Sequence, residues 1–145
     1  MIASSWPLGC GRYCDKPSNR FPISVLRTDK HRDLALLDHS DIPETEYYQP
    51  EKTQGFGIGE PVTAVGYPGF GKGDRINVRP GFVASFFVRS AVRYVEVTQK
   101  LLQGSSGGPL LDSSGRVIAV IHKGGPLIER DHAIHVDVIA QWVAE

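Results

Sequence analysis

Short runs of β-branched and aromatic residues recur along the chain, separated by stretches rich in glycine and proline, and this pattern limits the possible folds most strongly. Such runs are typical of strands joined by turns. In segment 92–98, Val95 and Val97 take one face while Glu96 and Thr98 take the other, so one side of this strand should face water. Many short strands predict a barrel or a sandwich. The strands are predicted over 21–27, 34–38, 62–67, 83–89, 92–98, 109–112, 117–122 and 133–136.

The C-terminal segment changes to the period of a helix. Val136, Ile139, Ala140 and Val143 follow the i, i+3, i+4, i+7 spacing of an amphipathic helix. Asp137 lies near its start, where the helix dipole favours a carboxylate. We therefore expect the chain to close with a helix that packs these four apolar residues on the strands.

Length and composition exclude several classes of protein. The 145 residues are enough for one domain, and the equal numbers of basic and acidic residues, 16 each, provide no field for nucleic acid or anionic lipid. No run is long and apolar enough for a membrane span, and segment 1–7 does not read as a signal peptide. Cys10 and Cys14 are too few for a closed zinc site, so a local disulfide or free thiols are expected. We expect no nucleic-acid partner, no metal and no cofactor.

The segment 103–109 is the strongest candidate for a site of chemistry, because it places Ser106 among glycines. A serine hydroxyl becomes a useful nucleophile where a tight turn exposes it, and flanking glycines allow such a turn. There the backbone N–H groups of Gly104 and Ser106 can converge to form an oxyanion hole, the donor pair for the charge that develops in acyl transfer. The same residues also suit an unreactive turn, so the segment by itself leaves both interpretations open.

Asp33 is the second candidate, since it stands where a polar loop enters the apolar strand 34–38. An acid at such a place can point inward and hold a histidine in the tautomer required for base catalysis. The same position also suits a turn aspartate that bonds to nearby backbone amides. The pattern of residues leaves this alternative open too.

Together these segments resemble the trypsin-like serine peptidases of the chymotrypsin fold. The family's Gly-x-Ser-Gly-Gly-Pro box is met by residues 104–109, and its Asp-Leu-Ala-Leu segment by residues 33–36. Residues 59–68 look like the segment that opens the second barrel in bacterial HtrA-type peptidases, and residues 111–120 look like the hairpin that follows the nucleophile there. The resemblance covers residues 21 to 145.

This resemblance implies an all-β fold, a double Greek-key β-barrel of the trypsin-like type with an incomplete first barrel and a C-terminal helix. One peptidase domain would span 1–145, with 1–58 forming a partial N-terminal barrel and 59–145 forming the C-terminal barrel and the terminal helix. The active site would lie between the barrels and act on a polypeptide. Ser106 would be the nucleophile and Asp33 the acid, while the N–H groups of Gly104 and Ser106 would form the oxyanion hole.

The chain departs from the family at the catalytic histidine. In the family this histidine precedes the aspartate by a few dozen residues, inside a small-residue-then-His motif, and here that stretch would fall at or before Met1. We expect the histidine to come from an upstream part of the protein or from another segment. His31 is close to Asp33 in sequence but does not match the family geometry, and the remaining candidates, His39, His132 and His135, fit less well.

The segment 121–125 resembles the substrate-binding strand of the glutamyl endopeptidases, in which a histidine binds the acidic side chain of the substrate. The resemblance implies substrate binding by His122, Lys123 and Gly124 and a preference for an acidic residue. Lys123 or Lys100 would add positive charge. Alternatively, His122 is an edge-strand histidine that faces water.

Two functions follow from these observations. The first is a serine endopeptidase with a Ser/His/Asp mechanism. The second is a pseudoprotease, in which the same scaffold binds peptides without hydrolysis. A phosphate-binding loop is disfavoured, because segment 71–73 lacks the Gly-Lys-Ser/Thr order and no helix pattern follows it.

Overall fold

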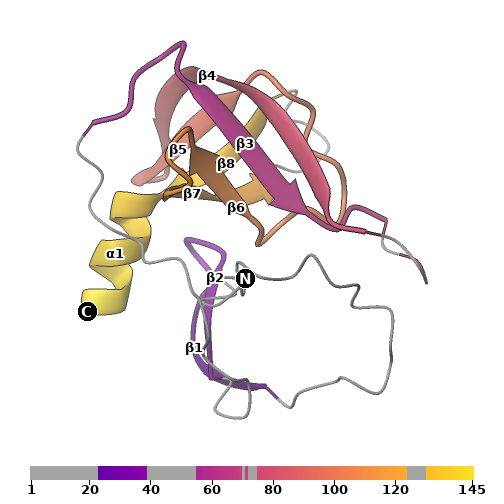
Figure 1. Cartoon of the computed structure of the whole chain (residues 1–145). Helices are drawn as coiled ribbons and strands as arrows, with labels where there is room; N and C mark the ends of the chain where they lie inside the picture. Colours follow the sequence, from indigo (N-terminus) through magenta and orange to yellow (C-terminus); the bar gives the residue numbers. More distant parts are fainter. Residues whose placement is uncertain (1–22, 39–54, 70, 72–74, 124–129) are drawn as a thin grey trace.

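The computed structural model describes residues 23–38, 55–69, 71, 75–123 and 130–145 (Figure 1). The sequence-based expectations for Cys10, Cys14, His39 and Gly124 lie outside these residues. None of the described residues form a helix that is long and apolar enough to cross a membrane.

Eight strands and one helix follow one another along the described chain. Their bounds are β1 Ser24–Asp29, β2 Leu34–Asp38, β3 Pro61–Gly66, β4 Asn77–Arg89, β5 Val92–Val97, β6 Pro109–Asp112, β7 Val117–Lys123, β8 Asp131–His135 and α1 Val136–Ala144. All eight predicted strands are present, although β4 begins at Asn77, well before the predicted start at Val83. It pairs with all of β3 through its first half and with β5 through its second, so two sets of partners extend it.

Strands β3 to β8 form a closed antiparallel barrel in the order β3-β4-β5-β8-β7-β6 (Figure 1). Closure occurs because β3 pairs with β6 as well as with β4. The last strand, β8, lies between β5 and β7, so the order in space departs from the order in sequence. The barrel and the terminal helix confirm the predicted all-β class and trypsin-like barrel.

The interior of the barrel is filled by aliphatic side chains from its strands. In β5, Val95 and Val97 point inward and are buried while Glu96 lies on the other face, as predicted. That other face does not lie open to water along its length, as was expected, because Val92 and Tyr94 on it are buried in a second cluster. The buried members of this cluster are Val62, Ala64, Val83, Val95, Val97, Leu101, Leu110, Ile118, Ala119, Ile121 and Ala133.

A second apolar cluster lies outside the barrel and holds α1 and the β1–β2 ribbon. It contains Leu34, Val92, Tyr94, Val120, Ile134, Ile139 and Trp142. The helix was predicted correctly, but its buried face was partly wrong, because Trp142 is 3% exposed and Val143 is 47% exposed. The indole offers more apolar surface than valine, and the helix turns it toward Leu34 of the ribbon.

Strands β1 and β2 form a two-stranded antiparallel ribbon with an irregularity between Val25 and Arg27. Figure 1 shows this ribbon beside α1, below the barrel, with the turn between its strands directed toward the barrel. The buried side chain of Leu34 at the start of β2 joins the outer cluster. The ribbon thereby brings the 30–33 turn next to β7 and β8.

Candidate functional site

The bend before β6 presents Ser106 to solvent. Gly104 has φ 94° and Gly107 has φ 85°, so the residue on each side of the Ser105–Ser106 pair adopts a left-handed conformation that favours glycine. Ser105 is buried, whereas Ser106 is exposed. The glycines predicted to make a tight turn therefore do so, and the exposed serine is the predicted one.

The bend is fixed to its neighbours through the backbone. The N–H of Gly107 donates to the carbonyl of Ile121 (2.9 Å), and the N–H of Ile121 donates to the carbonyl of Gly108 (2.8 Å). A Cβ atom at Gly108 would lie 2.2 Å from the carbonyl oxygen of Val65, so only glycine fits between the bend and β3. These contacts hold Ser106 beside β7.

The N–H groups of Gly104 and Ser106 have no hydrogen-bond partner within the described part of the chain. The hydroxyl of Ser106 likewise makes no hydrogen bond to a described residue. Two backbone donors and one hydroxyl on the same exposed bend can therefore contact a ligand oxygen and a ligand carbon without breaking an internal bond.

A pocket of about 250 Å³ joins this bend to the ribbon and the barrel wall. The structure brings together three of the predicted residues here, namely Ser106, Asp33 and His122. Lys100 is exposed and does not line the pocket. Lys123 belongs to β7, but its side chain lies outside the described part, as does Gly124. The described lining is Asp33, Ser106, Gly107, Val120, Ile121, His122 and Ile134.

Asp33 reaches the pocket from the end of the turn before β2. Its Oδ2 atom lies 3.2 Å from Nε2 of His122, although its side chain is 76% exposed. The prediction that Asp33 points inward is therefore wrong. The backbone has φ 55° at Asp33, and it is the next residue, Leu34, that enters the apolar cluster. Asp33 does hold a histidine, but from the solvent side.

His122 also contacts a second histidine, His132, on the neighbouring strand β8. Nδ1 of His122 lies 3.2 Å from Nε2 of His132, and Nδ1 of His132 lies 2.9 Å from the carbonyl oxygen of Arg130. A carbonyl only accepts, so Nδ1 of His132 carries its proton. Burial lowers the pKa of His132, which favours the neutral ring with a bare Nε2. His122 must then donate from Nδ1 to His132 and from Nε2 to Asp33.

Aromatic rings enclose the buried histidine of this pair. The ring of His132 packs edge-on against Tyr94 (5.0 Å between centroids) and against Phe87 (5.4 Å). Burial raises the pKa of the Tyr94 hydroxyl, and the negative charge of Asp33 raises it further. The aromatic rings thus shield His132 from water, and the Asp33 carboxylate provides a negative charge near Tyr94.

The profile of the trypsin-like peptidase domain matches residues 10–120, which is most of the chain. The chain belongs to the trypsin-like peptidase family. Protein y4bJ of Sinorhizobium fredii is 31% identical over 104 residues, which make up 70% of this chain and 16% of that protein. The present chain therefore spans about a sixth of the length of this relative.

Solved structures share the fold of this trypsin-like peptidase. The HtrA-type protease AlgW with decapeptide superposes with a TM-score of 0.74 at 18% identity, over 86% of this chain and 40% of that chain. The MamO protease domain from Magnetospirillum magneticum superposes with a TM-score of 0.65 at 21% identity, over 84% and 67% of the two chains. At these identities the likeness concerns the fold.

The described histidines of this trypsin-like peptidase all have partners other than Ser106. Nε2 of His31 lies 2.7 Å from the carbonyl oxygen of Ser90, and Nδ1 of His135 accepts from the backbone N–H of Asp137 at the start of α1. Both nitrogens of His122 and of His132 are engaged as described above. The structure does not bring His31 to Ser106.

Sequence reasoning missed the role of His132 as the partner of His122. The two residues are directly opposite in the β7–β8 register. Pairing the two predicted strands 117–122 and 133–136 as a hairpin would have suggested this contact, because an antiparallel register brings such residues face to face. The segment between the two predicted strands, 123–132, contains turn residues but is too long for them to fix the register, so the pattern alone did not reveal the pair.

Proposed function

We propose that this chain supplies the nucleophile, the oxyanion hole and the acid of a serine endopeptidase that acts on polypeptides. The observation that carries the proposal is the exposure of Ser106 on a glycine bend in the same pocket as Asp33. Membership of the trypsin-like peptidase family supports the same chemistry.

In the proposed reaction the Ser106 hydroxyl attacks the carbonyl carbon of the scissile peptide and gives its proton to a histidine base. The N–H groups of Gly104 and Ser106 donate to the resulting oxyanion. The tetrahedral intermediate then expels the amine, which takes the proton from the histidine, and water hydrolyses the acyl-enzyme by the same route. Asp33 orients the histidine and stabilises its charged form.

We assign the histidine base of this reaction to an upstream part of the protein or to another segment, and not to a described histidine. The described histidines bond to Ser90, Asp33, Arg130 and Asp137 rather than to Ser106. Without a base, a serine retains only the acceleration that the oxyanion hole and binding provide.

The backbone of β7 supports an extended peptide as the substrate. Ile121 directs its N–H and carbonyl toward the serine bend, where they bond to Gly108 and Gly107. Alternate residues of a strand point these groups to the same side, so those of Lys123 face the same way, just beyond the bend. An extended peptide that pairs there would place its carbonyl near Ser106.

A preference for an acidic residue of the substrate is the proposed specificity. His122 is the proposed cationic group, because the form that donates to both Asp33 and His132 carries a proton on each ring nitrogen. A carboxylate of the substrate would compete with Asp33 for Nε2 or share it. Cleavage profiling with a peptide library tests this specificity, and a preference for Arg, Lys or bulky apolar residues would reject it.

A peptide-binding module without hydrolysis is the second candidate function. It is favoured by one observation: in the described part of the chain no histidine forms a hydrogen bond with the Ser106 hydroxyl. The pocket and the β7 backbone would then bind a peptide that is not cleaved.

Reaction of the full-length protein with a fluorophosphonate probe separates the two candidates. We expect labelling of the wild type and of Ser114→Ala, a control that removes an exposed serine from the β6–β7 turn, and none of Ser106→Ala. A folded, full-length wild type that is not labelled but binds peptides would reject the endopeptidase and support the binding module.

A further inference from the structure

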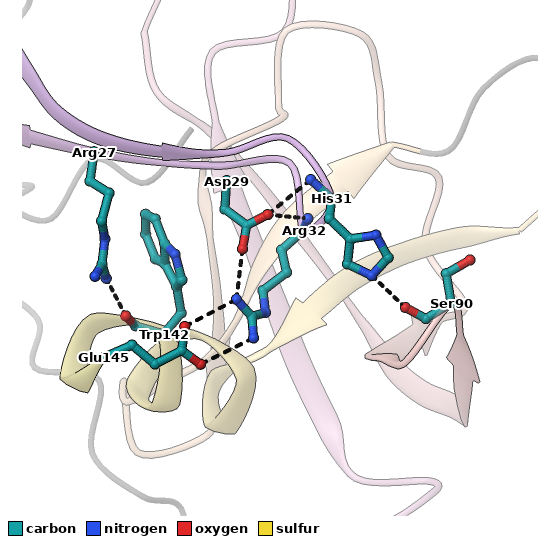
Figure 2. Close-up of polar contacts among 7 residues, drawn as sticks. All are labelled: Arg27, Asp29, His31, Arg32, Ser90, Trp142 and Glu145. Carbon is teal, nitrogen blue, oxygen red and sulfur yellow. Dashed lines mark hydrogen bonds and ion pairs between the residues drawn. The ribbon is translucent and has the colours of Figure 1, made fainter.

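The turn that ends in Asp33 is held by contacts on both of its sides (Figure 2). Asp33 has a left-handed backbone and little burial of its own, so the turn has to be fixed by its neighbours. Four residues provide these contacts: Asp29, His31, Arg32 and Glu145, the residue that caps the end of α1.

Asp29 stabilises the turn through hydrogen bonds with residues of the turn itself. Its Oδ1 atom accepts from the backbone N–H groups of His31 (2.9 Å) and Arg32 (3.0 Å), and its Oδ2 atom accepts from Nη1 of Arg32 (2.6 Å). The backbone and side-chain hydrogen bonds from Arg32 lower the pKa of the Asp29 carboxyl. Asp29 is therefore ionised at neutral pH and fixes the backbone immediately before Asp33.

Arg32 and His31 connect this braced turn to the rest of the protein. Nη2 of Arg32 lies 3.1 Å from Oε1 of Glu145, so one guanidinium bridges Asp29 and the end of α1. On the other side, Nε2 of His31 donates to the carbonyl of Ser90 in the turn between β4 and β5 (2.7 Å). Figure 2 shows the two contacts diverging from adjacent residues toward different elements.

The strand that precedes the turn is attached to the same helix. The guanidinium of Arg27 lies over the Trp142 ring, 4.4 Å from its centroid, and donates to the Trp142 carbonyl. This contact attaches β1 to α1. The Arg32–Glu145 pair attaches the turn to the end of the same helix.

We propose that Arg32 and His31 are positioning residues that place the Asp33 carboxylate at the pocket, with Glu145 as the anchor of Arg32 on the helix. The proposal rests on the proposed function, in which Asp33 is the acid. Loss of the anchor leaves the turn attached through β2 but free to rotate. The Asp33 carboxylate then leaves Nε2 of His122, while the barrel and the serine bend remain unchanged.

The ring signals of His122 in the ¹⁵N-histidine-labelled chain report this placement directly. Asp33→Asn gives the signals that follow loss of the carboxylate. We expect Arg32→Gln to move the His122 Nε2 signal in the same direction by more than half of that displacement, and Glu145→Gln to move it less. Arg32→Lys should restore part of the wild-type position, because an ammonium can pair with Asp29 or Glu145 but does not bridge them as a planar fork does.

Arg116→Gln is the matched control, since Arg116 forms a comparable pair with Asp112 (2.7 Å) on the β6–β7 hairpin. It should leave the His122 signals at their wild-type positions. If Arg32→Gln unfolds, Glu145→Gln, which alters an exposed side chain, decides the matter. Wild-type signals in Arg32→Gln and Glu145→Gln, or in Asp33→Asn itself, would overturn the proposal.

This measurement needs no catalysis, so it separates the two proposals. If the wild type fails to react with a fluorophosphonate while His122 responds to Arg32→Gln, the endopeptidase is wrong and the placement of Asp33 stands. If Ser106 is labelled but His122 does not respond, the reverse holds.

Discussion

Nδ1 of His122 lies 3.2 Å from Nε2 of His132, and this contact joins an exposed pocket to a buried hydrogen-bond acceptor. His132 is 2% exposed and gives its own Nδ1 proton to the Arg130 carbonyl. The chain of bonds from Arg130 through His132 to His122 therefore runs in one direction and ends in a proton on His122. When Nε2 of His122 is protonated as well, the ring is a positive group at the pocket wall.

His132→Phe removes the Nε2 atom that accepts from His122 and keeps a planar aromatic ring at this position. A hydrogen bond to a charged group contributes about 1.5–3 kcal/mol, so we expect the preference for Glu over Gln in a peptide to fall at least about tenfold. The ratio of kcat/KM values measures this for cleaved peptides, and the ratio of Kd values measures it for bound ones. The constant for the Gln peptide serves as the internal control, and an unchanged ratio contradicts the role of His132.

Gly108→Ala tests the close approach of the serine bend to β3. The added methyl group would lie 2.2 Å from the Val65 carbonyl oxygen, so the backbone has to shift and the free energy of unfolding should fall by about 2 kcal/mol or more. Gly115→Ala is the control, because φ there is 77° but no atom lies within 4 Å, and its cost should be about 1–2 kcal/mol. Urea unfolding measures both, and equal losses would contradict the packing of the bend.

Ile139→Ala and Val143→Ala test which face of α1 is buried. Ile139 is in the outer cluster, so its truncation should lower the free energy of unfolding by about 2–4 kcal/mol. Val143 is exposed, so its truncation should change the free energy by less than about 0.5 kcal/mol. Comparable losses in urea unfolding of the two variants would favour the face predicted from sequence.

The buried face of α1 shows how far the sequence pattern predicts which helix residues are buried. Val136 and Ile139 were predicted correctly, because the residues that follow the helix period are also the buried ones at these two positions. The choice between Trp142 and Val143 depends on the direction from which the β1–β2 ribbon approaches the helix. Leu34 and Arg27 meet Trp142 from that direction, and both are more than a hundred positions away in sequence.

In the candidate site, the local turn around Ser106 could be predicted from the sequence, whereas the placement of Asp33 could not. The glycines around Ser106 determine a local turn, and local turns follow from the residues that form them. The distance between Asp33 and His122 depends instead on how the ribbon is anchored, through pairs such as Arg32 and Glu145 that no periodicity reveals. The sequence therefore pointed to residues that share one pocket, but the expected inward orientation of Asp33 was wrong, because its side chain is exposed.

His135→Asn tests the acid sensitivity of the fold. Burial lowers the pKa of His132 and of His135 from the ordinary value of 6.5, so the unfolded chain binds protons more readily below that pH. The free energy of unfolding should fall as the pH decreases from about 6.5, by at most about 1.4 kcal/mol per pH unit for each histidine.

Asparagine keeps an acceptor for the Asp137 N–H at the helix start but does not titrate in this range. The variant should therefore lose stability less steeply than the wild type between pH 6.5 and 4.5, measured by urea unfolding at each pH. Identical slopes would assign the acid sensitivity to other groups. In the double variant with His132→Phe the slope should decrease further, because the second buried histidine no longer titrates.

The paired hydrogen bonds of Ile121 with Gly107 and Gly108 have a consequence for redesign of the pocket. They join the proposed nucleophile Ser106 and the proposed peptide-binding strand β7 through the backbone, so an alteration of β7 that changes peptide selection should also displace the Ser106 hydroxyl. Engineers who wish to retune selectivity and keep turnover should begin with β8 and the ribbon, whose side chains reach the pocket without sharing backbone bonds with the serine.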